Sequence, residues 1–338
     1  MSEALHILPD TSGTFRWVMS EVTQEYRSLA DLSVVVLSYN RREEIERAIP
    51  GLCGLAAEHG FQLIVVDNAS TDGSREALRG IAAGHPALEL LLNEENLGAA
   101  GGRNAGWRRA AGRYILSIDD DITVGVEQMR AMCARMDADP RIGVLSPRIR
   151  EAATGQVLND FGDEPCQIPT FYEACQLVRR EAVEVVGYGD PGCFAAGEGF
   201  DYTLRMHVAG YVAFYVPDVE VVHRDRVREG GESAHRRRMW VETFTALYFK
   251  HFPVRTALLF TTRFLVTQAL SGARVFGVGY AVTLPRWALA GARGGWKRRA
   301  VAPRETVRYY TRVDHPRDFG NRPLLHKVMK SLRARGEA

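Results

Sequence analysis

The chain has 338 residues, of which 46% are hydrophobic and 25% charged, and its formal net charge is +2. A chain of this length and hydrophobic content can bury a complete core, which excludes a disordered or fibrous protein and leaves room for one large domain with an accessory region. The five cysteines are odd in number and form no Cys-x-x-Cys pair, so neither a zinc knuckle nor a disulfide framework is indicated. Met1–Asp10 lacks a basic segment followed by an apolar core, so we expect a cytoplasmic protein without a secretory signal.

Charge is distributed unevenly along the chain. Residues 1–222 hold 19 Lys/Arg against 33 Asp/Glu, whereas residues 223–338 hold 24 against 8. The basic tail is therefore expected to meet an anionic partner. It contains no recognisable nucleic-acid-binding module, so we do not expect that partner to be nucleic acid.

Strands and helices alternate in the first part of the chain. The continuous β-branched run Leu32–Leu37 predicts a central parallel strand. The spacing of apolar residues predicts a helix over Arg42–Ala57, which Pro50 is expected to end or kink. A second strand over Phe61–Val66 leads into the polar loop Asp67–Gly73 and another helix. This alternation is typical of an open parallel sheet.

A glycine-rich segment, Gly98–Gly106, follows a third strand predicted over Leu88–Leu92. With Arg103, it could bring backbone N–H groups and a guanidinium close to phosphate oxygens. It has neither the Gly-Lys-Ser/Thr ending of a Walker loop nor the dinucleotide pattern Gly-x-Gly-x-x-Gly after the first strand. The alternative is that its small residues allow a helix to pack closely on the sheet.

Three adjacent aspartates, Asp119–Asp121, end the apolar run Tyr114–Leu116. Carboxylates this close repel one another, and a bound cation usually relieves the repulsion. In an extended segment Asp119 and Asp121 lie on the same face, so we predict that they form half of a metal–diphosphate site for Mg²⁺ or Mn²⁺. The alternative is a solvated acidic turn.

The remainder of the chain up to residue 223 is less regular. We predict a helix, a strand, an irregular segment and two late strands, the second ending in His223, over the following ranges: Val126–Met136, Ile142–Ser146, Arg148–Pro169, Tyr211–Val216 and Val219–Val222.

The segment Gly197–Arg205 carries two acids ahead of these late strands. If the segment begins a helix, Glu198 and Asp201 lie on one face of it. Such acids could serve catalysis, or they could simply complement the helix dipole.

In this order, the motifs resemble those of the family 2 glycosyltransferases of the GT-A fold, especially their rhamnosyltransferase-like bacterial members. The resemblance implies an α/β fold with a Rossmann-like, open, mixed and mostly parallel sheet flanked by helices. It places a catalytic domain at residues 31–225, after an N-terminal extension of residues 1–30 and before a basic, mainly helical C-terminal region of residues 226–338. The matching segments are Val34–Arg41, Val65–Ser74, Asn96–Gly98 with Gly101–Gly106, Asp119–Asp121, Glu198–Arg205 and Val221–His223.

The resemblance also implies roles for individual residues. A divalent ion, Mn²⁺ or Mg²⁺, would be held by Asp119, Asp121 and His223. The donor would be a nucleoside-diphosphate hexose or deoxyhexose such as rhamnose, and the acceptor a glycan, a lipid-linked molecule or a small molecule in polysaccharide, glycolipid or natural-product biosynthesis. The donor would be lined by Ser38, Tyr39, Asp67, Gly101, Arg103, Asn104, Asp119 and Asp120.

Members of this family usually invert the anomeric centre, with a carboxylate deprotonating the acceptor hydroxyl. Anchoring the sequence on Leu204–Arg205 puts Gly199 where that base most often stands. Either Glu198 or Asp201 abstracts the proton, or the acceptor is activated differently, or the site is impaired. An impaired site would make the chain a non-catalytic glycosyltransferase-like scaffold. A second alternative is a sugar nucleotidyltransferase, which shares an open nucleotide-binding sheet. It would need a phosphate loop directly after the first strand, which Ser38–Asn40 does not supply.

The C-terminal region combines apolar and basic residues. Arg224–Arg238 is expected to be a charged connection and Met239–Trp296 to be helical. The longest charge-free run, Val275–Pro285, has 11 residues, whereas a spanning helix needs about 20. Arg263 and Arg274 fall on one helical face, which could lie peripherally on the anionic inner face of a membrane. The same face could pack against the catalytic domain or a second subunit of a homo-oligomer.

Overall fold

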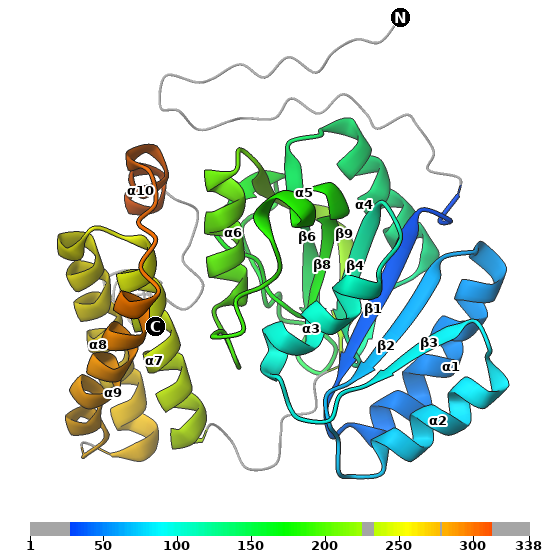
Figure 1. Ribbon diagram of the computed structural model, residues 1–338, viewed down its shortest axis with the longest axis horizontal. Coiled ribbons are helices and arrows are strands. Elements are labelled where there is room, and N and C mark those ends of the chain that lie inside the picture. The colour runs from blue at the N-terminus through cyan, green and yellow to red at the C-terminus, as the bar shows by residue number, and fades with distance from the viewer. Residues whose placement is uncertain (1–27, 225–232, 278, 313–338) are drawn as a thin grey trace, which may run out of the picture. The chain divides into compact units, whose positions relative to one another are not determined.

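The computed structural model describes residues 28–224, 233–277 and 279–312 (Figure 1). These residues divide into two compact units. The sheet unit holds residues 28–194 and 198–224, and the helical unit holds residues 195–197 and the described residues from 233 onward.

A single mixed sheet forms the centre of the sheet unit. Among the described residues it has nine strands in the order β3-β2-β1-β4-β8-β6-β9-β5, with β7 paired to β9 outside this path. The pairs joining β3, β2, β1 and β4 are parallel, and β8 runs antiparallel to both β4 and β6. The strands are β1 Leu32–Ser38, β2 Gln62–Asp67, β3 Leu88–Leu92, β4 Tyr114–Asp119, β5 Ile122–Thr123, β6 Ile142–Glu151, β7 Cys166–Ile168, β8 Cys175–Arg179 and β9 Val212–His223.

Helices flank the sheet and make up most of the helical unit. In the sheet unit they are α1 Arg42–His59, α2 Ser74–Gly84, α3 Gly98–Arg109, α4 Val126–Ala138, α5 Arg180–Val186 and α6 Glu198–Val208. In the helical unit they are α7 Ala234–His251, α8 Val254–Phe276, α9 Gly279–Lys297 and α10 Arg304–Thr311. None of the helices in the described ranges combines the length and hydropathy that crossing a bilayer requires.

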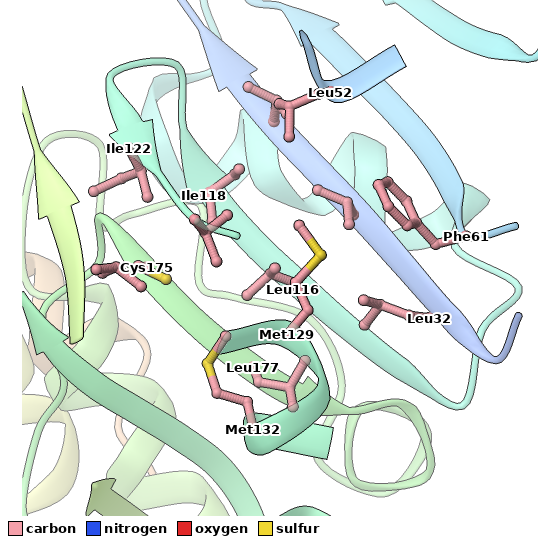
Figure 2. Packing of buried hydrophobic residues seen from close by; sticks show 14 of the residues in the cluster. Leu32, Leu52, Phe61, Leu116, Ile118, Ile122, Met129, Met132, Cys175 and Leu177 are labelled. Carbon is pink, nitrogen blue, oxygen red and sulfur yellow. The ribbon is translucent and has the colours of Figure 1, made fainter. Parts of the chain in front are cut away.

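Alternation along β1 sends side chains to two separate cores. Val34 and Val36 belong to the main hydrophobic cluster, together with residues of α1 and α4 such as Ile45 and Met129. Figure 2 shows part of this cluster, with Met129 and Met132 of α4 lying beside Leu116 and Leu177 of the sheet. Val35, between them in sequence, faces α3 on the other side of the sheet. Because both faces of β1 are covered, its run of β-branched residues is continuously apolar and does not alternate with polar ones.

Glycines let α3 lie directly on that second face. A Cβ at Gly106 would overlap Val35 Cγ1 and stand 3.1 Å from Val66 Cγ2, and a Cβ at Gly102 would overlap or crowd Leu37 and Asn68. The close-packing alternative therefore accounts for these two glycines. Because these two glycines have no side chains, α3 and its Arg103 can lie close to the carboxyl ends of β1 and β4.

The structure corrects several expected boundaries. Helix α1 continues through Pro50 to His59, because Ile45, Ile49 and Leu52 stay buried against the sheet and outweigh the hydrogen bond that proline cannot make. It ends instead at Gly60, whose φ of 77° is left-handed.

Later elements are also longer than expected. Part of the segment predicted to be irregular is regular, since β6 runs to Glu151 and β7 covers Cys166–Ile168. The two late strands are one, β9, which pairs with β6 through a register shift rather than a break. Helix α7 begins at Ala234 with Ser233 as its N-cap, so Arg236–Arg238 are helical and not a connection. Arg226, Arg228 and nearly all of the predicted N-terminal extension lie outside the described residues.

Close backbone contacts also hold the helical unit together. A Cβ at Gly291 or Gly295 of α9 would overlap the carbonyl oxygen of Glu242 or Ala246 on α7. Arg237 of α7 donates to Gln268 Oε1 of α8 at 2.9 Å. The three longest helices of this unit thus pack as one body.

Replacing Gly106 by alanine tests the close packing of α3. The added methyl group has no space against Val35, so we expect the free energy of unfolding to fall by about 2 kcal/mol. Gly80→Ala in α2 is the matched control, because a Cβ there meets nothing within 4 Å and should stabilise the helix by about 0.5 kcal/mol. Denaturant unfolding measures both, and equal midpoints for Gly106→Ala and the parent chain would contradict the packing.

Candidate active site

Polar side chains gather where β1, β2 and β4 end. The parallel registers align Ser38 with Asp67 across β1 and β2, and Leu37 with Asp119 across β1 and β4. Ser38, Asp67 and Asp119 therefore lie along one edge of the sheet, the edge at which parallel α/β sheets usually bind ligands.

A hairpin-like contact brings His223 to the aspartates. The two-residue strand β5 pairs antiparallel with the end of β9, so that Ile122 lies opposite His223. The backbone N–H of Arg224 donates to the Asp121 carbonyl at 2.9 Å, and His223 Nε2 lies 3.1 Å from Asp121 Oδ1. One ligand atom each from Asp119, Asp121 and His223 fall within 4.8 Å of one another. The three predicted metal ligands are thus neighbours in space.

Arg41, which sequence reasoning did not single out, neutralises part of this cluster. Its guanidinium donates to Asp121 Oδ2 at 2.8 Å and lies 3.9 Å from Asp120 Oδ1. Burial alone would raise the pKa of Asp121, but the hydrogen bond and charge of His223, together with Arg41, outweigh burial and hold that pKa below its ordinary value. The sequence signal available for Arg41 was its place directly after Ser38–Asn40, in the loop at the end of a strand.

Asp120 has a different environment from its two neighbours. Its buried carboxylate accepts a hydrogen bond from Ser38 Oγ at 2.5 Å. Burial raises the pKa of Asp120 to about 8, aided by the charge of Asp121 and opposed by Ser38 and Arg41. Asp120 and Ser38, both predicted to line the donor, therefore tie the aspartate loop to the end of β1.

A buried arginine joins the glycine-rich helix to the acids. Arg103 donates to Asp119 and to Glu198, and its Nη2 also donates to the Glu173 carbonyl at 2.9 Å. Burial would lower the pKa of Arg103, but the charges of Glu198 and Asp119 outweigh that effect and raise it. Burial raises the pKa of Glu198 to about 8 despite the opposing charge of Arg103.

Asp67 combines full burial with an unused hydrogen-bonding atom. Its Oδ2 accepts from the Ser70 N–H at 3.1 Å and lies 3.3 Å from Arg75 Nε. Its Oδ1 is buried and has no hydrogen-bond partner within the described ranges. A buried carboxylate oxygen without a partner is costly unless a ligand satisfies it. Tyr39 follows β1, the strand that pairs with β4, and its side chain is 42% exposed and open to a ligand.

Two other predicted donor residues serve the fold of α3. Asn104 donates to the Gly189 carbonyl at 2.8 Å and accepts from the Gly189 N–H at 2.9 Å. A Cβ at Gly101 would come within 2.7 Å of Leu97 Cβ, so this glycine allows a local turn of the chain. Within the described ranges neither residue is hydrogen-bonded to the aspartates.

Both predicted bases are engaged with arginines. Glu198 pairs with Arg103, and the fully buried Asp201 pairs with Arg205 Nε at 2.7 Å. Arg205 also donates to the carbonyls of Val186 and Tyr188, which fixes it to the end of α5 and the segment after it. A carboxylate that sequence reasoning missed, Glu173, accepts from the Gly199 N–H at 3.0 Å. No local pattern marks Glu173, because it precedes a strand that the sequence did not predict.

The comparison with known proteins gives a family match for the first part of the chain. Residues 33–187, which include β1 to β4 and the three aspartates, match the profile of Glycosyl transferase family 2. The chain carries a family 2 glycosyltransferase domain.

Two curated relatives are similar to this chain in sequence. The N-acetylglucosaminyl-diphospho-decaprenol L-rhamnosyltransferase of Mycobacterium tuberculosis is 26% identical over 249 residues, covering 60% of this chain and 79% of its own length. The succinoglycan biosynthesis protein ExoO of Rhizobium meliloti is 36% identical over 110 residues, but these span only 30% of its length.

A mannosyltransferase from Pyrobaculum calidifontis, solved with GDP-Man and Mn²⁺, superposes with a TM-score of 0.55 at 21% identity, covering 83% of this chain and 90% of that one. At this identity the likeness shows the fold alone, and the GT-A fold predicted from the motifs is confirmed.

Arg103 is expected to be essential to the stability of the family 2 domain. In Arg103→Met, Asp119 and Glu198 lose a buried counter-charge, so the free energy of unfolding should fall by about 3 kcal/mol. Arg109→Met on the same helix is the matched control. Its side chain is 61% exposed and pairs with Glu89, so its loss should cost less than about 1 kcal/mol. Equal unfolding midpoints for the two variants would show that the buried pairs contribute little.

Proposed function

We propose that the chain is an inverting, metal-dependent glycosyltransferase that moves a hexose or deoxyhexose from a nucleoside-diphosphate sugar to an acceptor hydroxyl. The observation that carries the proposal is the group of Asp119, Asp121 and His223 at the same sheet edge as Asp67. A cation site beside a nucleoside site is what a diphosphate-linked donor requires. The catalytic domain is taken as residues 31–225.

The donor set fits a divalent ion. Two carboxylate oxygens and one imidazole nitrogen suit Mn²⁺ or Mg²⁺, and Mn²⁺ accepts nitrogen more readily. When bound, the ion would offset negative charge on the leaving diphosphate. Asp119, Asp121 and His223 would hold it, while hydrogen bonds from Arg103 and Arg41 orient the two carboxylates.

The chain's own residues would bind and orient the substrates. The free Oδ1 of Asp67 would accept a hydrogen bond from the donor's base or ribose, and Tyr39 would lie against the nucleoside. A carboxylate would take the proton of the acceptor hydroxyl. At the same time the acceptor oxygen would form its bond to the anomeric carbon, and the bond from that carbon to the diphosphate would break. The electron pair of the broken bond leaves with the nucleoside diphosphate.

The relatives support the substrate classes. The mannosyltransferase was solved with a nucleoside-diphosphate sugar and Mn²⁺, and the rhamnosyltransferase is named for a polyprenyl-diphosphate-linked acceptor. By analogy, a glycan or lipid-linked acceptor in cell-surface polysaccharide or glycolipid assembly is the class that we propose here, with a small-molecule acceptor in natural-product biosynthesis as its alternative.

Donor turnover tests this function. Incubated with Mn²⁺ and, in turn, UDP-, GDP- and dTDP-linked sugars, the protein should release the nucleoside diphosphate slowly with water as acceptor, and chelation with EDTA should abolish the release. A sugar nucleotidyltransferase would consume the nucleotide sugar only after pyrophosphate is added, and would then form a nucleoside triphosphate and a sugar 1-phosphate. A scaffold would release nothing in either case.

The metal site has its own test. Asp121→Ala should weaken Mn²⁺ binding at least 100-fold, measured by electron paramagnetic resonance of free Mn²⁺, because a buried carboxylate ligand is lost. Asp163→Ala is the matched control, since that side chain is 94% exposed and pairs with Arg148. Unchanged Mn²⁺ affinity in Asp121→Ala would refute the assignment of the ligands.

We infer that the helical unit binds an anionic bilayer surface. Residues 243–304 contain ten Lys/Arg and no Asp/Glu, an imbalance that complements acidic headgroups. Helices α8 and α9 expose apolar side chains between arginines such as Arg263 and Arg286, as an interfacial helix does. The exposed apolar residues include Leu258, Leu259, Val266, Leu270, Val282, Leu289 and Trp296. Such a surface would hold the enzyme peripherally at the inner leaflet.

Flotation of the full chain tests the membrane surface. Phosphatidylcholine vesicles containing phosphatidylglycerol should carry the protein upward, and pure phosphatidylcholine vesicles should not. Arg263→Gln with Arg286→Gln should lower partitioning about 30-fold, since each arginine near an anionic surface contributes about 1 kcal/mol. Arg79→Gln, an exposed change in α2, should leave it unchanged. Equal flotation of the double variant, or a dimer formed through this surface, would contradict the inference.

A further inference from the structure

Glu173 is held beside the metal-ligand cluster by its backbone. Its carbonyl oxygen accepts from Arg103 Nη2 at 2.9 Å, and the next carbonyl, of Ala174, accepts from the Asp119 N–H at 3.0 Å. Arg103 in turn donates to the Asp119 carboxylate. Two backbone contacts therefore fix Glu173 next to the residue that ends β4.

The side chain of Glu173 fills the space over Gly199. A Cβ at Gly199 would overlap the carbonyl oxygen of Phe171 and stand 3.2 Å from Glu173 Oε1. The Gly199 N–H donates to this same oxygen at 3.0 Å. A carboxylate thus stands where a short side chain on residue 199 would project, although it is delivered from the segment before β8.

The other carboxylates of this edge have different tasks. Asp119 and Asp121 are the proposed ligands of the cation, and Asp120 is buried against Ser38. Glu198 is buried against Arg103, and Asp201 is fully buried against Arg205. An acid that is buried and paired with an arginine is poorly placed to exchange protons with an incoming hydroxyl.

Glu173 differs from these acids because its carboxylate forms no ion pair within the described ranges. Its side chain is partly exposed, and among the described residues its one hydrogen bond is from the Gly199 N–H. That single bond orients the carboxylate and leaves its second oxygen without a donor from the described residues. An oriented, accessible carboxylate beside a cation site is what general-base catalysis at an acceptor hydroxyl needs.

We propose that Glu173 is the catalytic base of the sugar transfer, supplying from the segment before β8 the carboxylate that residue 199 lacks. The inference rests on the proposed function. The Glu173 carboxylate takes the acceptor proton, the acceptor oxygen forms its bond to the anomeric carbon, and the bond from that carbon to the diphosphate oxygen breaks. The nucleoside diphosphate leaves with the electron pair, and protonated Glu173 returns its proton to solvent.

The experiment compares Glu173→Gln, Glu173→Asp and Glu173→Ala with the wild type, using the same panel of UDP-, GDP- and dTDP-linked sugars with Mn²⁺. Glu181→Gln, an exposed change in α5, is the matched control. We expect Glu173→Gln to bind Mn²⁺ and UDP, GDP or dTDP within twofold of the wild type and to release diphosphate at least 100-fold more slowly. Glu173→Asp should retain part of the rate, and added formate should partly restore Glu173→Ala.

The pH profile separates a base from a positioning role. The acidic limb of kcat in the wild type should disappear in Glu173→Gln, which a loss of packing alone would not produce. Release by Glu173→Gln within threefold of the wild type would overturn the role of Glu173 and leave the proposed function intact. Loss of Mn²⁺ and nucleotide binding in that variant, or failure of formate to restore any rate, would also overturn it. No metal-dependent release by the wild type with any donor would refute the proposed function, and the role of Glu173 with it.

Discussion

The arrangement of the sheet edge depends on one buried guanidinium. Arg103 lies between Asp119 and Glu198, and it reaches the backbone at Glu173 as well. These three partners come from different parts of the chain, namely the end of β4, the start of α6 and the segment before β8. Without this buried guanidinium, the carboxylates of the three residues would repel one another in a site that water solvates poorly. Because Arg103 joins these three segments, the site assembles as the sheet unit folds.

The position of that guanidinium follows from the glycines around it. Because Gly102 and Gly106 present no side chains to the sheet, α3 can approach β1 and β2 closely enough for Arg103 to reach the strand ends. The glycine-rich segment was predicted to approach phosphates, with close packing as the alternative. The structure gives these glycines a packing role, and that packing carries a charged side chain to the site. The two interpretations are therefore connected rather than exclusive.

The sequence predicted well those features that depend on neighbours along the chain. The strand ends at Ser38, Asp67 and Asp119 follow from continuous apolar runs that stop at polar residues, and the strands β1, β2 and β4 lie where expected. The nearness of His223 to Asp121 was anticipated only through the family resemblance, because it depends on the pairing of β5 with β9. Contacts between distant segments were not predictable in this way. Arg41 and Glu173 carry no local signal of their partners, and the single long β9 depends on its pairing with β6.

The contact between residues 173 and 199 restricts how this site can change over evolution. An acid introduced at Gly199 would collide with the Phe171 backbone and crowd the Glu173 carboxylate, so a single substitution there would damage the chain before it could help. The reverse exchange, removing the acid at 173 first, would remove the proposed base before another acid could replace it. The two positions are therefore expected to vary together, with glycine at one accompanying glutamate at the other. Descendants of this chain could move the acid from one segment to the other only through an intermediate that is unstable or inactive.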